Sequence, residues 1–296
     1  MNAIELNAVT FEQGGLQLND ITFQVPEGYV TGFIGTNGAG KTTIIRLIMD
    51  LYSPQSGTIT LWQQRMQEDP VGIKDRIGFV YSESYFNENW TVKKLEKIIA
   101  PFYSRWDHDK FLQLLQRFNI VPEKKIKTLS TGMKMKLSLT IALSHHADLF
   151  IFDEPTSGLD PVVRNEVLEM IQQELIKSNK TVFMSTHIIS DLEMIADYIV
   201  YLSDGQIKLH GSTNDILQRY QIIHGSILDL DDELSSLLLY KDERATGFTA
   251  LTEHAQVFEE ILGNKVEIER PTIEKLMVYL ENGKDNCHKQ SGGFKQ

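Results

Sequence analysis

Hydrophobic residues recur along this chain at two spacings, and the spacing changes from segment to segment. Short apolar runs and alternating apolar positions that end at glycine or aspartate are typical of strands. Apolar residues three and four apart, such as Ile44, Leu47 and Ile48, are typical of helices that bury one face. The pattern predicts strands at residues 3–11, 21–25, 30–34, 58–62, 76–81, 149–152, 181–185, 198–202 and 206–210. It predicts helices from residue 41, through most of 91–146, at 161–178, at 188–196 and after Pro271.

The order of these elements indicates the class of fold. Strands that alternate with helices favour a mainly parallel sheet covered by helices on both faces, which is an α/β architecture. A pair of strands, separated by Gly14 and Gly15, precedes that alternation. The long helical stretch interrupts it. The sequence therefore predicts a parallel-sheet core to which a strand pair and a helical part are attached.

The character of the chain changes beyond about residue 218. The acidic stretch Asp229–Glu233 comes next, followed by a segment of mixed character that ends in the helix after Pro271. The last residues are rich in Gly, Lys and Gln, a composition typical of a disordered tail. The predicted divisions are a large domain at 1–218 with a helical part at about 84–147, a small accessory domain at 219–283 and a disordered tail at 284–296.

A glycine-rich loop joins the predicted strand at 30–34 to the helix that starts at Lys41. Such a loop lets backbone amides approach phosphate closely, and the helix adds its positive N-terminus. Lys41 places a positive charge at the β- and γ-phosphates, and the hydroxyl of Thr42 can bind Mg²⁺. The predicted contacts with a nucleoside triphosphate are Gly35, Thr36, Asn37, Gly38, Ala39, Gly40, Lys41, Thr42 and Thr43.

Two adjacent carboxylates end the apolar run Leu149–Phe152. Asp153 is suited to bind Mg²⁺, directly or through water. Glu154 is expected to point elsewhere and to polarise a water molecule that attacks the γ-phosphate. An ordinary strand end with solvated acids would explain the pair taken alone. The phosphate loop upstream favours the catalytic interpretation.

Three further segments carry polar residues at positions suited to an anion. Ser130 and Gly132 stand at the start of an apolar helix, where a simple helix cap is the alternative explanation. Asp160 belongs to the segment Ser157–Pro161, just after the acidic pair. His187 follows an apolar strand and can donate to a γ-phosphate, although a lone histidine is more often structural.

Together these segments resemble the ATP-binding cassette (ABC) ATPases, in which five such elements occur in this order. They are the phosphate loop, the LSTGM signature, the FIFDEP strand, the SGLD loop and the STH segment, within about residues 3–218. The segments IGFVYSE, GMKMKLSLTIALSHHA and PTIEKLMVYLENG are similar to Gram-positive exporters of bacitracin and of phenol-soluble modulin peptides. The resemblance implies a phosphate-loop NTPase cassette with a parallel-sheet core, an antiparallel β subdomain and a helical subdomain, followed by a small α+β extension.

The resemblance also implies that one chain does not complete an ATP site. Ser130 and Gly132 would contact the γ-phosphate of an ATP held by a second ATPase subunit, and Asp160 would reach across that interface. Phe11 matches the aromatic residue that stacks on adenine, where tyrosine is commoner. The implied cofactors are ATP and Mg²⁺. ATP binding would close the dimer and hydrolysis would open it, driving membrane permease subunits docked near residues 81–90.

The sequence departs from the family pattern at two places. The signature is usually LSGGQ, and here Thr131 replaces its first glycine while Met133 replaces the glutamine. A slower or an asymmetric site is compatible with this change. The family also has a glutamine after the predicted strand that ends near Tyr81, and this position falls on Ser82. Either Ser82 or Glu83 is the expected ligand of Mg²⁺ or water there.

Composition limits the partners of this 296-residue chain. The formal net charge of −11 does not favour nucleic acid or the anionic membrane surface. No apolar run approaches the roughly 18 residues that span a bilayer, and the N-terminus lacks a secretion signal. The single cysteine, Cys287, excludes an intramolecular disulfide and fits a reducing cytosol. We therefore expect a cytoplasmic protein without direct membrane insertion, held at the cell membrane by permease subunits.

The leading functional hypothesis is an ATP-hydrolysing subunit of an exporter, with antimicrobial or amphipathic peptides as one substrate class. Lys41, Glu154 and His187 are the predicted catalytic residues. A soluble ABC ATPase that acts on ribosomes or DNA is a second hypothesis, but this chain has neither a second cassette nor long coiled coils. A weakly hydrolysing regulatory cassette is a third. The complete catalytic set argues against it, and the altered signature leaves it open.

Overall fold

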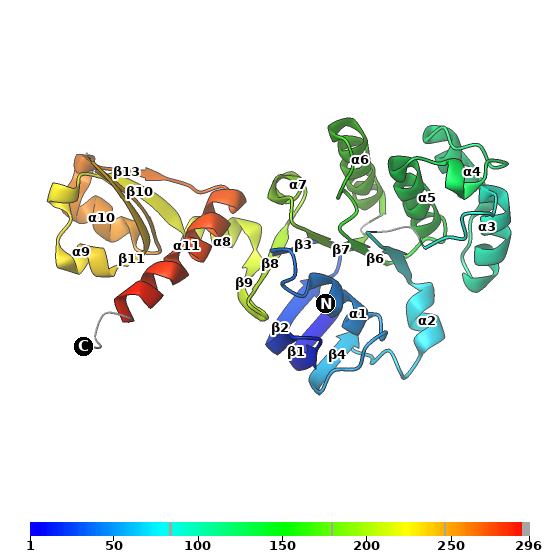
Figure 1. Ribbon diagram of the computed structural model, residues 1–296, viewed down its shortest axis with the longest axis horizontal. Helices are drawn as coiled ribbons and strands as arrows, with labels where there is room; N and C mark the ends of the chain where they lie inside the picture. Colours follow the sequence, from blue (N-terminus) through cyan, green and yellow to red (C-terminus); the bar gives the residue numbers. More distant parts are fainter. Residues whose placement is uncertain (83–84, 179, 246, 292–296) are drawn as a thin grey trace. The chain divides into compact units, whose positions relative to one another are not determined.

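The computed structural model describes residues 1–82, 85–178, 180–245 and 247–291 (Figure 1). The chain forms two compact units, Met1–His210 and Gly211–Gln296. The first unit contains a six-stranded sheet, a three-stranded sheet and most of the helices, and the second contains a four-stranded sheet. The α/β class predicted from the alternation of strands and helices is therefore confirmed.

The six-stranded sheet has the order β5-β6-β7-β3-β8-β9. Its strands are β3 (Val30–Gly35), β5 (Ile77–Val80), β6 (Leu149–Asp153), β7 (Thr181–Thr186), β8 (Tyr198–Ser203) and β9 (Gln206–Ser212). The neighbouring pairs β5–β6, β6–β7, β7–β3 and β3–β8 are all parallel. Every residue of β3, β6 and β7 is buried, which explains why these strands are near-continuous apolar runs. Because the strands are parallel, the carboxyl ends of β3, β6 and β7 meet at one edge.

The three-stranded sheet is antiparallel and has the order β2-β1-β4. It comprises β1 (Asn2–Gln13), β2 (Leu16–Pro26) and β4 (Ser56–Leu61). Phe23 of β2 stacks on Phe33 and Phe183 of the parallel sheet, with ring centroids 5.8 Å apart in both pairs. Helix α1 (Lys41–Ile48) buries Ile44, Ile45, Leu47 and Ile48 in the same core. The two sheets therefore share one hydrophobic core around the start of α1.

The helical stretch lies between β5 and β6 in the chain. It contains α3 (Val92–Ile99), α4 (His108–Arg117) and α5 (Thr131–Leu143), which lie together in Figure 1, and α2 (Pro70–Asp75) precedes β5. The sequence did not predict α2. Phe102 falls within the predicted helical stretch 91–146, but it lies outside the α-helix and is 76% exposed. The α-helix ends at Ile99, and a 3₁₀ turn that contains Pro101 follows, because proline interrupts the helical hydrogen bonds.

Two helices flank β7 in the chain. Helix α6 (Pro161–Ser178) has the predicted bounds. Helix α7 (Ile189–Glu193) is shorter than the predicted 188–196, and its chain continues through Asp197, whose carboxylate accepts the N–H of Val30 at 2.9 Å. None of the helices in the described ranges combines the length and apolar character that a bilayer crossing requires.

The second unit is built around an antiparallel sheet of order β11-β12-β10-β13. Its elements are α8 (Thr213–Arg219), β10 (Gln221–Gly225), α9 (Asp232–Ser236), β11 (Leu238–Arg244), β12 (Gly247–Thr252), α10 (Ala255–Leu262), β13 (Val266–Glu269) and α11 (Ile273–Ser291). From β10 to β13 this is the βαββαβ arrangement of ferredoxin-like domains. Ile223, Phe248 and Phe258 are fully or nearly fully buried in its core. The predicted α+β extension is thus a small sheet with helices.

Both boundaries of the second unit differ from the expected ones. The division falls after His210 rather than after 218, because α8 bonds to this unit: Arg219 pairs with Glu253 at 3.0 Å, and Arg270 donates to Asn214 at 2.9 Å. At the other end, α11 continues to Ser291, past the predicted domain end at 283. The part of the predicted disordered tail from 284 to 291 is therefore helical, and 292–296 lie outside the described residues.

A buried histidine at the end of α5 makes the first unit sensitive to acid. His145 is fully buried, its ring is stacked 3.9 Å from that of Tyr103, and burial lowers its pKa to about 4. In the unfolded chain the His145 ring takes up a proton near its ordinary pKa of 6.5, whereas in the folded chain it stays neutral down to about pH 4. The stability that this difference contributes is therefore present above pH 6.5 and is lost as the pH falls from 6.5 to 4. When this contribution is lost completely, the free energy of unfolding falls by about 3 kcal/mol.

We expect His145→Phe to reduce the difference between melting temperatures measured at pH 7.5 and pH 5 by thermal unfolding. Phenylalanine keeps the stacked ring and removes the group that must take up a proton. His254→Phe, at an exposed position of the second unit, is the control and leaves the difference unchanged. An equal pH dependence in wild type and His145→Phe would contradict the assignment.

Candidate functional site

The glycine-rich loop connects the end of β3 to the first turn of α1. Gly38 and Gly40 have φ angles of 83° and 108°, a region that side chains rarely adopt. A Cβ atom on Gly40 would also lie 2.8 Å from Cδ2 of Leu18. The loop borders a hollow of about 280 Å³ lined by Leu16, Asn37, Gly38, Gly40, Lys41, Thr42, Thr43 and Glu154. Most of the predicted loop residues therefore form one wall of a pocket at the start of a helix, whereas Gly35, Thr36 and Ala39 do not line it.

Lys41 is buried at the base of this loop, with 5% of its side chain exposed. Its ammonium donates to the carbonyl oxygens of Gly35 at 2.7 Å and Thr36 at 3.2 Å. It also lies 3.2 Å from Oε1 of Glu154. A buried ammonium needs such partners because desolvation is costly. The cation is thus held between the loop and the acidic end of β6, where a phosphate group can bind to it.

Asp153 meets hydroxyl groups from two other elements. Its Oδ1 accepts from Ser185 Oγ at 2.7 Å and from Thr42 Oγ1 at 3.3 Å. Its Oδ2 is buried and has no hydrogen-bond partner within the described residues. A buried carboxylate oxygen is costly to leave unmatched, and a carboxylate beside a threonine hydroxyl suits Mg²⁺, which takes its other ligands from phosphates and water. The donor set therefore fits a magnesium ion at this place.

Ser185 is a site residue that the sequence did not single out. It pairs with Asp153 across β6 and β7, and both its Oγ and its carbonyl oxygen accept from the N–H of Glu154, at 3.0 and 3.1 Å. Its place at the end of an apolar strand, two residues before His187, is the signal that could have identified it. The side chain orients Asp153 and fixes the turn that carries Glu154.

We expect Ser185→Ala to raise the Mg²⁺ concentration for half-maximal ATPase activity. Loss of a partner that orients a metal ligand typically weakens binding about 10- to 100-fold. Titration of MgCl₂ at saturating ATP measures the shift, and Ser203→Ala at the end of β8 serves as the control. An unchanged Mg²⁺ requirement would show that Ser185 does not orient a metal ligand.

Glu154 and His187 form a second contact at the same edge of the sheet. Glu154 has φ of 50°, a left-handed conformation that is uncommon for a residue with a side chain. Its carboxylate contacts Lys41 and, through Oε2, His187 Nδ1 at 2.9 Å, whereas that of Asp153 faces Ser185. The two adjacent carboxylates therefore have separate partners. Glu154 is 19% exposed and His187 35% exposed, so water can reach both.

Ser130, Gly132 and Asp160 lie at the starts of two other helices. Ser130 caps α5 by accepting the N–H of Met133 at 3.2 Å, as the simple alternative expects. Asp160 caps α6 by accepting the N–H groups of Val162 and Val163 at 3.0 and 3.1 Å. None of the three is among the residues that line the pocket at the phosphate loop. Their role toward an ATP on a second subunit stays a prediction.

Two residues that were predicted to contact ATP or Mg²⁺ do not line this pocket. Phe11 is 7% exposed and stacks on Tyr52 with centroids 5.5 Å apart, while Leu16 of β2 lines the pocket instead. Ser82 is exposed beyond the end of β5, and no hydrogen bond between described residues joins it to Asp153 or Thr42. Glu83, its alternative, lies outside the described residues. The roles of Phe11 and Ser82 remain predictions.

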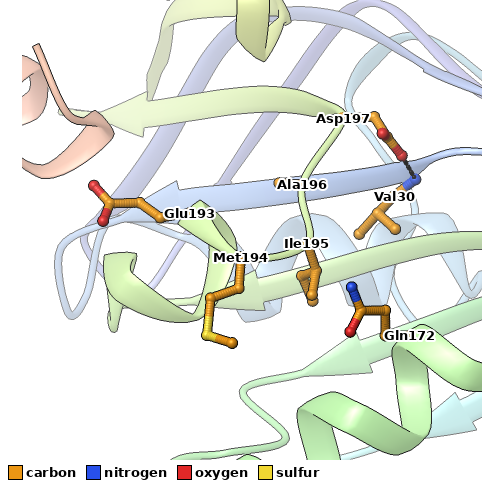
Figure 2. Close-up of a pocket in the computed structure, with 7 residues that line it drawn as sticks. All are labelled: Val30, Gln172, Glu193, Met194, Ile195, Ala196 and Asp197. Carbon is orange, nitrogen blue, oxygen red and sulfur yellow. Dashed lines mark hydrogen bonds between the residues drawn. The ribbon is translucent and has the colours of Figure 1, made fainter.

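A second hollow of about 320 Å³ lies at the opposite edge of the sheet, where β3 and β8 begin. Figure 2 shows Asp197 bonded to the N–H of Val30, with Gln172 of α6 and the segment 193–197 around it. Glu193 and Met194 are exposed there. None of the predicted site residues lines this hollow, so it is separate from the phosphate loop.

Comparisons with known proteins show what this chain is similar to. The sequence profile of the ABC transporter family matches residues 18–157. The chain is 30% identical over 218 residues to the ABC transporter ATP-binding protein YtrB of Bacillus subtilis, covering 73% of this chain and 74% of that protein. It is 32% identical to the bacitracin transport ATP-binding protein BcrA of Bacillus licheniformis, covering 64% and 63%. A solved ATP-binding subunit of an ABC transporter superposes with a TM-score of 0.66 at 28% identity, covering 72% and 91%.

The chain belongs to the ATP-binding proteins of ABC transporters. It binds ATP, hydrolyses it and powers transport, which is the leading hypothesis from the sequence. The alternative of an ATPase acting on ribosomes or DNA is not supported by these relatives. The fold predicted from the resemblance, a phosphate-loop NTPase cassette, is confirmed.

Proposed function

We propose that this chain is one of two ATPase subunits that drive an exporter, and that each subunit holds ATP with Mg²⁺ at the edge where β3, β6 and β7 end. The observation that carries the proposal is the arrangement of Lys41, Glu154 and Asp153 at one sheet edge. Lys41 pairs with Glu154 beside the phosphate loop, and the adjacent Asp153 accepts from Ser185 and Thr42. Three groups with separate tasks at one sheet edge are what phosphoryl transfer to water requires.

The side chains have distinct roles in this mechanism. Lys41 exchanges the loop carbonyls for the β- and γ-phosphates of ATP. Thr42 and Asp153 would hold Mg²⁺, which neutralises charge on the phosphate oxygens when bound. Glu154 accepts the proton of the attacking water, and its neighbours Lys41 and His187 keep the carboxylate in place. His187 then donates to the γ-phosphate as charge develops there.

The second ATPase subunit supplies the remaining contacts. Ser130 and Gly132 lie at the N-terminus of α5, outside the pocket of their own chain, and a helix N-terminus attracts phosphate. A second copy, or a different cassette, would bring this helix end to the γ-phosphate. Asp160 and the loop before α6 would contribute to the same interface. ATP then closes the dimer, and hydrolysis opens it.

The transported substrate is proposed from the relatives. BcrA of Bacillus licheniformis is named for bacitracin transport, and the same name is given to a relative from Enterococcus faecalis that is 26% identical and covers 86% of this chain and 84% of that protein. We infer that this chain powers the export of antimicrobial or amphipathic peptides through membrane permease subunits. Those subunits hold it at the cytoplasmic face of the cell membrane.

Purification of the tagged chain from native membranes tests the proposal. Permease subunits and a second ATPase subunit are expected to copurify, and the cells are expected to lose resistance to a peptide such as bacitracin when the chain is deleted. The control is the same tag on a chain that lacks residues 81–90, the predicted docking segment. Copurification of ribosomes without membrane proteins would overturn the transport proposal.

A further inference from the structure

Asp191 is a fully buried carboxylate to which the mechanism described above gives no task. It lies in α7, four residues after His187. One of its oxygens accepts from Thr156 Oγ1 at 2.6 Å, and the other accepts from Nε of Arg164. Arg164 donates in addition to Ser190 Oγ at 2.7 Å. A buried charge that is fully hydrogen-bonded holds the segments it joins in one arrangement.

The partners of Asp191 belong to the two segments that carry Glu154 and Asp160. Thr156 follows the general base Glu154 by two residues. Arg164 stands in the first turn of α6, where its N–H donates to the carbonyl oxygen of Asp160 at 2.9 Å. The carboxylate therefore connects α7, the turn after β6 and the start of α6. It does so from the protein interior, without contact with the pocket itself.

The first turn of α6 also abuts the signature of the same chain. A Cβ atom on Gly132 would lie 3.2 Å from Cγ1 of Val163, so the two helix starts are packed closely. The N–H of Val163 donates to the carboxylate of Asp160 at 3.1 Å. Because Val163 and Arg164 are neighbours in one helical turn, a shift of Arg164 moves both Asp160 and the surface that Gly132 contacts.

We propose that Asp191 is a positioning residue that links His187 to the first turn of α6. Contact of the γ-phosphate with His187 then sets the position of Asp160 and of the signature, which face the second subunit. The link rests on the proposed function, because it takes His187 as the contact with the γ-phosphate. Arg164 and Thr156 follow any movement of Asp191, because each donates a hydrogen bond to its buried carboxylate.

Two kinds of variant test this link in the full chain. Asp191→Asn keeps the volume but removes the charge that Arg164 binds, and Thr156→Val keeps the volume but removes the hydroxyl. Both are expected to lower kcat for ATP about 10- to 100-fold, while KM for ATP changes by no more than about twofold. Thr156→Ser retains the hydroxyl and is expected to restore kcat. Asp197→Asn is the control, because Asp197 bonds to Val30 at the opposite edge of the sheet.

Amide hydrogen exchange separates positioning from a merely structural role. In wild type, ATP with Mg²⁺ is expected to slow exchange in the phosphate loop at 35–43 and in the segment 157–165. In Asp191→Asn and Thr156→Val the loop should remain protected, while protection at 157–165 is lost. The control Asp197→Asn should keep both.

Protection of 157–165 that is as large in Asp191→Asn as in wild type would overturn the link. A parallel loss of protection in the loop, with a KM that rises as kcat falls, would also overturn it and assign Asp191 a structural role. Absence of protection at 35–43 in wild type would instead refute the proposed function, and the link with it. The two failures are therefore distinguishable.

Discussion

Glu154→Gln is expected to lower steady-state ATPase activity by about 10²- to 10⁴-fold, the usual contribution of a general base. The amide keeps the size of the side chain and can still contact His187, but it cannot accept the proton of the attacking water. ATP binding should persist, because Lys41 and the loop are unchanged. ATP then accumulates in the closed state, and size-exclusion chromatography with ATP and Mg²⁺ should show a stable dimer. Phosphate release measures the loss of activity.

Glu166→Gln is the matched control for this experiment. Glu166 lies in α6 of the same unit and pairs with Lys136 on the surface, with 48% of its side chain exposed. Exposed ion pairs contribute little, so activity and oligomeric state should equal those of wild type. Normal turnover in Glu154→Gln would reject Glu154 as the base. A dimer that forms equally with ADP would reject the trapped ATP state.

Lys41→Ala is expected to weaken ATP binding about 10- to 150-fold, the equivalent of one hydrogen bond to a charged group. The buried ammonium contacts two loop carbonyls and Glu154, and its removal leaves that carboxylate without its cation. Binding of a fluorescent ATP analogue measures the change. Because the Lys41 side chain is almost fully buried, its loss should also lower the melting temperature of the nucleotide-free protein.

Lys74→Ala is the control for this second experiment, because Lys74 stands exposed on α2. Its ATP affinity and melting temperature should match those of wild type. An unchanged affinity in Lys41→Ala would contradict the assignment of the phosphate loop. A loss of affinity accompanied by an unfolded circular dichroism spectrum would show instead that Lys41 is needed for folding.

Several features of the structure could be predicted because their signals are local. The apolar runs of β3, β6 and β7 are continuous since both faces are covered, and this is visible in the sequence. Gly38 and Gly40 of the phosphate loop stand where φ is positive. Pro161 marks the start of α6 at the expected residue, since proline fits the first turn of a helix.

Other features depend on which segments pack together. Phe11 lies at the position of the adenine-stacking residue, yet its ring is buried against Tyr52, more than 40 residues away in the chain. The contact of Ser185 with Asp153 depends on the pairing of β7 with β6, which brings the two residues side by side. In the second unit β10 and β13 have only five and four residues, so the local pattern indicates the four-stranded sheet weakly.

The sequence by itself determined the family, the phosphate loop, the acidic pair and the alternation of strands and helices, because these depend on residue type and on spacing of 2 or 3.6 residues. The tertiary structure alone decided which side chains meet. It placed Ser185 on Asp153, Lys41 and His187 on Glu154, and both Thr156 and Arg164 on the buried Asp191. These contacts join residues far apart in the chain, and their partners follow from strand order and helix packing, which local patterns do not encode.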